Sequence, residues 1–257
     1  MNEPLVLSSI TGIPLIKPGI DLSKVIFGAL NQNGIRLTNR DVIVVTQKIV
    51  SKAENRYVNL IDIDPSKRAM EISETIQKDP RLIELILSES QQVLRMKEGT
   101  IIVEHRLGFI CANAGIDHSN VKGLYGDPED WYLLLPKNPD KSAQGIRDDI
   151  YGFCGTYVGI LIIDSQGRAW RNGTIGTTIG LAGLPGLVDL RGYEDLFGYK
   201  LKVTQVAVAD ELAAAASLIM GQTKEKIPVV HVRGFPYSLR DADLQELLRK
   251  KDLDLFR

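Results

Sequence analysis

The chain has 257 residues, of which 44% are hydrophobic and 25% are charged, and its 31 basic residues balance 32 acidic ones. A globular protein of this length buries about three quarters of its unfolded surface and needs no disulfide to fold. The charge balance and the lack of a polybasic run argue against nucleic acid or anionic lipid as a partner, and no apolar segment approaches the roughly 18 residues of a membrane span.

The first part of the chain alternates short apolar runs with helical patterns. We expect a strand at residues 5–10, then a shaped loop in TGIPLIKPG, because this stretch holds two prolines and two glycines. Asp21 is placed to cap a helix. A second, β-branched strand follows at residues 41–46.

The stretch QKIVSKAENR follows the second strand directly. If it opens a helix, Lys48 and Lys52 lie on one face near the helix N-terminus, a geometry that suits a phosphate. The alternative is a solvated basic face. A Walker A loop is excluded, because GxxxxGK[ST] is absent.

Proline positions divide the next segment into two helices. Asp64 as N-cap and Pro65 at the first helical position predict the first helix, and Pro80 separates it from a second over residues 81–94. Residues 100–105 and 108–113 predict a hairpin.

The second half of the chain contains the strongest strand signal and a confident helix. The pattern first predicts a helix at 142–153 and a strand at 157–164, followed by a stretch rich in Gly, Thr and Ile at 173–186. It then predicts a strand at 201–209 and a helix at 209–221 that ends at Gly221. A strand at 227–234 and an amphipathic C-terminal helix at 238–256 complete the chain.

Several strands are joined without room for an intervening helix. This favours an α+β fold with mixed, partly antiparallel sheets and packed helices, in two intertwined subdomains. The N-terminus lacks the features of a signal peptide, and neither Cys111 nor Cys154 belongs to a CxxC motif. We therefore expect a cytoplasmic protein with reduced thiols.

Polar residues stand at the ends of two apolar runs. Asp164 and Ser165 follow the strand at 157–164, where carboxylate and hydroxyl oxygens can hold a hard cation, and Arg168 and Arg171 come next. Guanidinium groups beside a metal-competent carboxylate suit phosphate chemistry. From spacing alone, a β-turn with a solvated basic loop is slightly favoured.

The stretch NAGIDHSN offers a second carboxylate, Asp117. Asn120 could bond a base, ribose or phosphate oxygen, but taken singly this stretch is better explained by an Asx-type turn. Taken with Asp164, Asp117 makes a two-carboxylate cation site credible. Gln222, after the helix at 209–221, offers a neutral oxygen, or is simply part of a helix-end loop.

Several enzyme classes are excluded by missing motifs: GxSxG, HExxH, GxGxxG after a strand, and paired CxxC. Three histidines without ligand spacing argue against zinc hydrolysis. Phosphate-bearing substrates with Mg²⁺ or Mn²⁺ fit the remaining candidates best, and the reaction stays open at this point.

At these same residues the sequence resembles the coenzyme F420-0:L-glutamate ligase family, also called F420-0:γ-glutamyl ligase. The matching stretches include GIPLIKPG, VVTQKIVSKAENR, CANAGIDHSNV, VGILIIDSQGRAWRNGTIGTTIGLAG and DLRGYEDLFGYKLKVTQVAVADELAAAASLIMGQ. They occur in family order and cover the chain to about residue 235. The resemblance therefore divides the chain into a ligase-like domain at 1–236 and a C-terminal helical extension at 237–257.

The resemblance implies a GTP-dependent ligase. The family activates the terminal carboxylate of coenzyme F420-0 through an acyl phosphate, and the amine of L-glutamate attacks it, with further γ-linked glutamates added in turn. It uses Mg²⁺ or Mn²⁺, with two ions expected, and K⁺ as an activator, and it forms an intertwined homodimer.

The resemblance also assigns residues. It implies cation ligation by Asp117, Asp164, Ser165 and Gln222, and catalytic roles for Asp117, Asp164 and Lys48. It implies nucleotide contacts by Ile13, Pro14, Leu15, Ile16, Gln47, Lys48, Lys52, Asn120, Met220, Gly221, Gln222, Thr223, Lys224, Glu225, Lys226 and Ile227. A role for Arg168 or Arg171 on the substrate phosphate is our own inference, and His118 receives no role.

Two other functions compete with this one. The first is a paralogous amide ligase that acts on another phosphorylated carboxylic acid. The second is a non-catalytic nucleotide- or cofactor-binding protein, against which the presence of Asp117, Asp164 and Gln222 argues.

Overall fold

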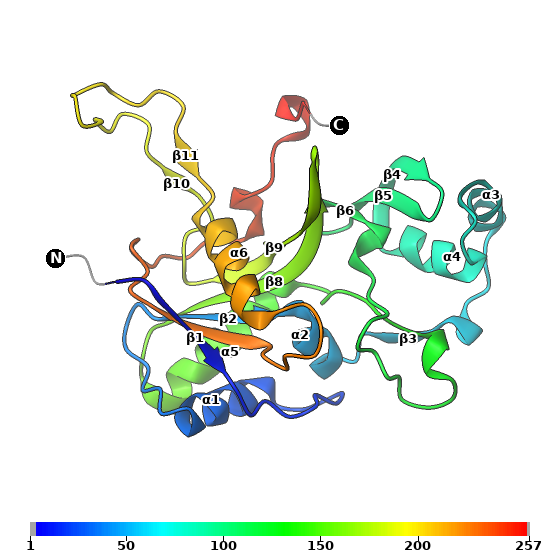
Figure 1. Cartoon of the computed structure of the whole chain (residues 1–257), viewed down its shortest axis with the longest axis horizontal. Helices are drawn as coiled ribbons and strands as arrows, with labels where there is room; N and C mark the ends of the chain where they lie inside the picture. Colours follow the sequence, from blue (N-terminus) through cyan, green and yellow to red (C-terminus); the bar gives the residue numbers. More distant parts are fainter. Residues whose placement is uncertain (1–3, 256–257) are drawn as a thin grey trace.

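The computed structural model describes residues 4–255 and confirms an α+β fold with mixed sheets (Figure 1). The largest sheet has the strand order β1–β12–β2–β8–β9. Its strands are β1 (Val6–Ile10), β2 (Val42–Thr46), β8 (Gly159–Arg168), β9 (Arg171–Ala182) and β12 (Val229–Arg233). Within it, β2 and β8 run parallel and the other neighbours run antiparallel.

Helices cover both faces of this sheet, because β2 and β8 are apolar on both sides. Ile43 and Val45 pack in one cluster with α1 (Leu22–Gln32), α2 (Gln47–Ala53) and α5 (Pro139–Cys154). Val42 and Val44 alternate with them and pack in a second cluster with α6 (Val208–Met220), which Figure 1 shows lying over the sheet. Continuous apolar runs are typical of strands buried on both faces.

A second lobe has a separate apolar cluster. It contains α3 (Lys67–Ile76), α4 (Pro80–Ser88) and the three-stranded sheet of β4 (Ser90–Lys97), β5 (Thr100–His105) and β6 (Ile110–Ala112). The strands β3 (Tyr57–Asn59) and β7 (Trp131–Leu133) pair with each other. Short 3₁₀ turns occur at Leu60–Asp62, Asn113–Gly115, Pro128–Asp130, Leu244–Glu246 and Lys251–Leu253.

An arm extends away from the body (Figure 1). It is closed at its base by the short strands β10 (Val188–Asp189) and β11 (Gln205–Val206). Its tip exposes apolar side chains, with Leu196 96% and Phe197 94% exposed. Across residues 4–255, none of the helices combines the length and apolarity needed to cross a bilayer.

Strand direction gathers several loops at one end of the main sheet. The carboxyl ends of β1 and β2 and the middle of β8 meet the amino end of β12 there. The loop after β1, helix α2 and the loop before β12 therefore all leave the sheet at the same end. Asp164 lies there too, because its neighbour Ile163 pairs with Thr46, the last residue of β2.

Local signals predicted several elements correctly. The Asp21 carboxylate accepts a hydrogen bond from Lys24 N as the cap of α1, and α6 ends at Gly221. The expected hairpin of residues 100–105 and 108–113 is confirmed as the antiparallel pair β5–β6. QKIVSKA does form a helix, α2.

The two predicted helices of the second lobe need correction. Asp64 and Pro65 do not start α3; Ser66 is the cap, and its hydroxyl accepts from Ala69 N. The helix expected over 81–94 ends at Ser88, because the following residues pair with β5 as β4, starting with Ser90 opposite His105. Pairing between strands outweighs the local helical pattern here.

Two predicted strands in the second half differ in length from the observed strands. The strand expected at 201–209 shortens to β11, because α6 already begins at Val208. The strand expected at 157–164 continues to Arg168, because it pairs with β9 along this length. The glycine-rich pattern of residues 173–186 did not predict β9.

The C-terminal helix expected at 238–256 is absent from the described part of the tail, which contains 3₁₀ turns instead. Contacts to the body hold this segment. Glu246 accepts hydrogen bonds from the backbone of Gly186 and Leu187, and Asp140 accepts from Leu244 N. Residues 1–3 and 256–257 lie outside the described residues, so expectations for these positions stay predictions. The domain boundary at residue 236 and the two intertwined subdomains also stay predictions.

Candidate active site

Helix α2 presents its first side chain to Asp117. Gln47 is only 2% exposed, and its Nε2 donates to Asp117 Oδ2 at 2.6 Å. The Ser51 hydroxyl, one turn later, donates to Gln47 Oε1 at 2.9 Å. This second bond turns the amide N–H groups of Gln47 toward the carboxylate.

The two lysines of α2 hold the loop that follows Asp117. Lys48 Nζ lies 3.3 Å from Asp117 Oδ2 and donates to the backbone oxygen of Ser119 at 2.9 Å. Lys52 Nζ donates to the backbone oxygen of Asn120 at 2.7 Å. The predicted shared face of Lys48 and Lys52 is therefore confirmed, and both ammonium groups face the loop of residues 117–120.

Positive charge is concentrated at this helix face. Burial, and then the neighbouring ammonium of Lys48, lower the pKa of Lys52, while Asp117 opposes the shift. A phosphate group between the lysines would lower the repulsion between them.

Asp164 supplies a second carboxylate to the same place. Burial and then the nearby charge of Asp117 raise the pKa of Asp164 to about 6, and Lys48 only partly offsets this effect. Gln166 Nε2 donates to Asp164 Oδ2 at 3.3 Å, and the Thr177 hydroxyl donates to the backbone oxygen of Asp164 at 3.3 Å. Two carboxylates thus approach each other with one ammonium nearby.

This donor set fits a hard divalent cation. Asp117 and Asp164 repel each other as anions, and a cation between them would remove that repulsion. Among residues 4–255 no group of three His, Cys, Asp or Glu side chains is arranged to hold a metal. Two carboxylates alone therefore leave coordination positions for neutral oxygens, water or a substrate phosphate, as Mg²⁺ prefers.

The other two predicted cation ligands are not brought into contact with this pair. Ser165 is exposed and follows Asp164 on β8, so strand alternation directs its side chain to the opposite face. Gln222 is exposed, and within the described residues no contact joins it to either carboxylate. Its neighbour Thr223 is closer to the site, since Asn120 Nδ2 donates to the Thr223 backbone oxygen at 3.4 Å.

The two predicted nucleotide loops lie at the same end of the sheet. In the first, Ile16 is buried in the core while Leu15 is 85% exposed, and Gly19 N donates to the backbone oxygen of Ala53, the last residue of α2. In the second, Glu225 accepts hydrogen bonds from the backbone N–H and hydroxyl of Thr223, and its pKa is lowered by backbone hydrogen bonds.

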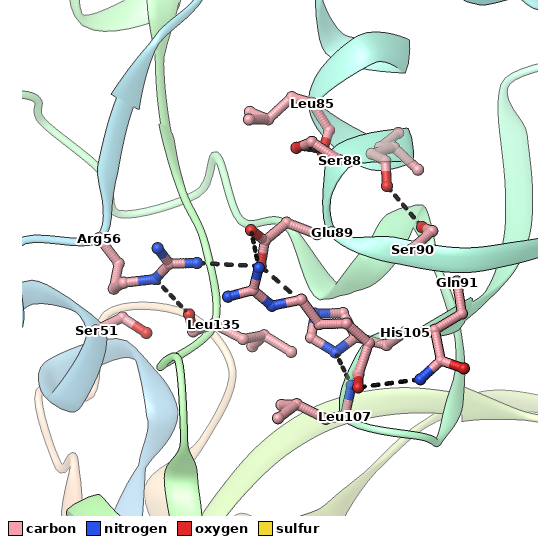
Figure 2. A network of polar contacts seen from close by, with 12 residues as sticks. Ser51, Arg56, Leu85, Ser88, Glu89, Ser90, Gln91, His105, Leu107 and Leu135 are labelled. Atoms are coloured by element: carbon pink, nitrogen blue, oxygen red, sulfur yellow. Dashed lines mark hydrogen bonds and ion pairs between the residues drawn. The ribbon is translucent and has the colours of Figure 1, made fainter.

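A buried ion-pair network fixes the far end of α2. Arg56 Nε donates to the backbone oxygen of Leu135 at 2.8 Å, and its Nη2 donates to Glu89 Oε2 at 3.0 Å (Figure 2). Arg106 Nη1 lies 3.4 Å from Glu89 Oε1. Because Glu89 follows α4 and Arg106 follows β5, this network ties α2 to the second lobe, from which the chain enters the Asp117 loop.

His105 completes this network as a neutral side chain. Burial, followed by the charges of Arg106 and Arg56, lowers its pKa to about 4. Leu107 N donates to His105 Nδ1 at 3.0 Å, so the proton of the neutral ring is on Nε2. Nε2 has no hydrogen-bond partner among the described residues and lies 3.8 Å from Glu89 Oε2.

Sequence reasoning missed several residues that shape the site. Ser51 orients Gln47, and Gln166 and Thr177 contact Asp164. Periodicity gave a partial signal, because Ser51 stands four residues after Gln47 on α2. His118, which received no role, has its Nδ1 3.1 Å from the backbone oxygen of Trp131 and its Nε2 3.2 Å from Glu129 Oε2.

Comparisons with known proteins point in one direction. The family described as F420-0:Gamma-glutamyl ligase matches residues 11–234. A protein of Methanothermobacter thermautotrophicus named Coenzyme F420:L-glutamate ligase is 45% identical over 253 residues, covering 98% of both chains. Proteins of the same name from Methanocaldococcus jannaschii and Archaeoglobus fulgidus are 40% and 38% identical over 248 residues, covering 95% and 96% of this chain and 94% of each relative.

Proposed function

The chain belongs to the F420-0:gamma-glutamyl ligase family, and we propose that it is a GTP-dependent ligase that joins L-glutamate to the terminal carboxylate of coenzyme F420-0 through an amide bond. The observation that carries this proposal is the approach of Asp117 and Asp164 beside Lys48. An anionic carboxylate and an anionic nucleotide repel each other, and Lys48 and Lys52, together with the divalent cation that the two carboxylates would hold, would supply the compensating positive charge.

The reaction proceeds in two steps. The acceptor carboxylate takes the γ-phosphoryl group of GTP, which forms an acyl phosphate and releases GDP. The amine of L-glutamate then attacks the acyl carbon, so that a C–N bond forms and inorganic phosphate leaves. Repetition on the γ-carboxylate of the added glutamate gives a γ-linked tail.

Each residue of the site has a part in these steps. Asp117 and Asp164 would hold Mg²⁺ or Mn²⁺; when bound, the metal would neutralise charge on the transferred phosphoryl group. The ligand roles of Ser165 and Gln222 rest on the family resemblance alone, because among the described residues neither side chain contacts the two carboxylates. Lys48 adds positive charge at the same point. Gln47 holds the Asp117 carboxylate in place. K⁺ acts as an additional activator.

GTP binds at the end of the sheet where the loops gather. Its phosphates contact Lys48, Lys52, Gln47 and Asn120, and its nucleoside contacts Ile13–Ile16 and residues 220–227. The support for this placement is the common origin of these segments at one end of the sheet and the hydrogen bond between Asn120 and Thr223.

The protein acts as a cytoplasmic homodimer in this proposal. The extended arm supports the dimer, because an arm with Leu196 and Phe197 almost fully exposed is costly to leave in water and can bury both against a second copy. In a dimer with two-fold symmetry, the arm of each subunit would contact the equivalent surface of the other subunit.

Phosphate release tests the proposal. The protein, incubated with GTP, Mn²⁺ and L-glutamate, is expected to release phosphate only when coenzyme F420-0 is also present, and to release less with ATP in place of GTP. Glutamate addition in the absence of any nucleotide would overturn the proposed activation step.

A further inference from the structure

Two arginines face each other at the tip of the β8–β9 hairpin. Arg168 and Arg171 are register partners across the turn, and both are exposed. Like charges directly opposite each other destabilise a strand pair. Within residues 4–255 neither arginine forms an ion pair with a carboxylate, so the protein itself does not compensate this repulsion.

The tip is continuous with the face of the hairpin that carries Asp164. Alternate residues of a strand share a face, which places Gln166 beside Asp164; Arg168 is the next alternate residue and follows a shift in the β8–β9 register between Gly167 and Arg168. The hydrogen bond from Gln166 Nε2 to Asp164 Oδ2 confirms the first half of this row. Arg168 is four residue steps along the strand from Asp164, a span of about 13 Å at the usual rise per residue.

Among the described residues, most of the hydrogen-bonding capacity of Arg168 and Arg171 is unused. Arg168 Nη1 donates to the backbone oxygen of Gly173 at 3.3 Å, and a guanidinium carries five N–H donors. A solvated turn would explain the exposure of both side chains but would leave their repulsion without compensation. Paired guanidinium groups bind carboxylates in a bidentate geometry.

We propose that Arg168 and Arg171 form a binding site for the free α-carboxylate of a glutamyl residue, an inference that rests on the proposed ligase function. A γ-linkage consumes the γ-carboxylate of a glutamate and leaves its α-carboxylate charged. When the reacting carboxylate of the acceptor lies beside Asp164, the glutamates already attached extend along the β8–β9 hairpin. Their free α-carboxylates then lie toward the tip of the hairpin. The alternative source of the same group is the incoming free glutamate.

The test uses the full-length protein and two readouts. The variants are R168A/R171A, the conservative R168K/R171K, and R95A as a control, since Arg95 is exposed on β4 in the second lobe. The first readout is calorimetric binding of γ-linked triglutamate. The second is the set of steady-state constants for coenzyme F420-0 and glutamate, together with the tail-length distribution of the products.

We expect R168A/R171A to weaken triglutamate binding about tenfold, the lower range for losing a charge-assisted contact at an exposed site. Shorter tails without a rise in KM for glutamate would identify the attached tail as the ligand, and a tenfold rise in KM for glutamate would identify the incoming amino acid. R168K/R171K should recover part of the binding, and R95A should match the wild type.

Wild-type triglutamate binding and wild-type tail lengths in R168A/R171A would overturn the inference. A rise in KM for GTP alone would also overturn it. A wild-type protein that binds triglutamate through these arginines but adds no glutamate would refute the proposed ligase function and leave the binding site standing.

Discussion

Replacing Asp164 by asparagine separates two effects of this carboxylate: the destabilisation that its buried charge causes in the folded protein, and its contribution to the rate of glutamate addition. Its pKa is raised from 3.8 to about 6, so folding disfavours the charged form of Asp164. At about 1.4 kcal/mol per pKa unit, the charge costs at most about 3 kcal/mol in the metal-free protein. The cost is absent below about pH 4, grows as the pH rises through 6, and is complete above it.

The D164N variant without metal should therefore be at least as stable as the wild type at pH 7, by up to about 3 kcal/mol, and the two should converge near pH 4. Urea unfolding of both proteins in the presence of a chelator measures this difference. Glutamate addition should fall at least about a thousandfold, because the cation contributes several kcal/mol of transition-state stabilisation.

The exposed Asp62 provides a matched control, since D62N changes the charge equally but lies outside the site. D62N should change neither stability nor turnover appreciably. Full turnover by D164N would refute the cation role of Asp164. A loss of stability in metal-free D164N at pH 7 would refute the argument that its charge is unfavourable in the fold.

Three further predictions concern the network and the arm. E89Q should cost about 3 kcal/mol in urea unfolding, because it leaves Arg56 buried without its anion, and a change below about 0.5 kcal/mol would contradict this. The pKa of His105 is about 4 in the folded protein and 6.5 when exposed, so stability should fall as the pH drops from 6.5 toward 4, by up to about 3 kcal/mol; H105Q should remove this part of the slope, and an unchanged slope would be inconsistent with a neutral ring. L196D/F197D should convert a dimer into a monomer in light scattering, whereas I61D should not, and a dimer that persists would exclude the arm as the interface.

Local chemistry made part of the fold predictable from the sequence. The run VIVVT followed by QKIVSKA gave β2 and α2, and with them the shared face of Lys48 and Lys52. Asp21 and Gly221 marked helix ends through capping. These signals act within a few residues, so no tertiary contact was needed to interpret them.

Elements that depend on distant partners were not predictable in this way. Residues 90–94 have a helical pattern but pair with β5, and β9 forms from a glycine-rich stretch because β8 lies beside it. The amphipathic tail forms 3₁₀ turns where Glu246 and Asp140 tie it to the body. In each case, contacts with another segment outweigh the local pattern.

The site shows the same limit. Each motif alone favoured an ordinary loop or a solvated face, and the sequence made a site of Asp117 and Asp164 together credible without showing that they meet. The structure brings these two together with Gln47 and Lys48, although Gln47 and Asp117 are 70 residues apart. Ser165 and Gln222 are not in contact with them, so their ligand roles stay predictions.

Mass spectrometry of coenzyme F420-0, incubated with the protein, GTP, Mn²⁺ and L-glutamate, tests the proposed function most directly. The account predicts products heavier than coenzyme F420-0 by one or more glutamyl units, formed only when GTP and the metal are both present. Unchanged coenzyme F420-0 in the complete mixture, with a folded protein that binds GTP, would contradict it.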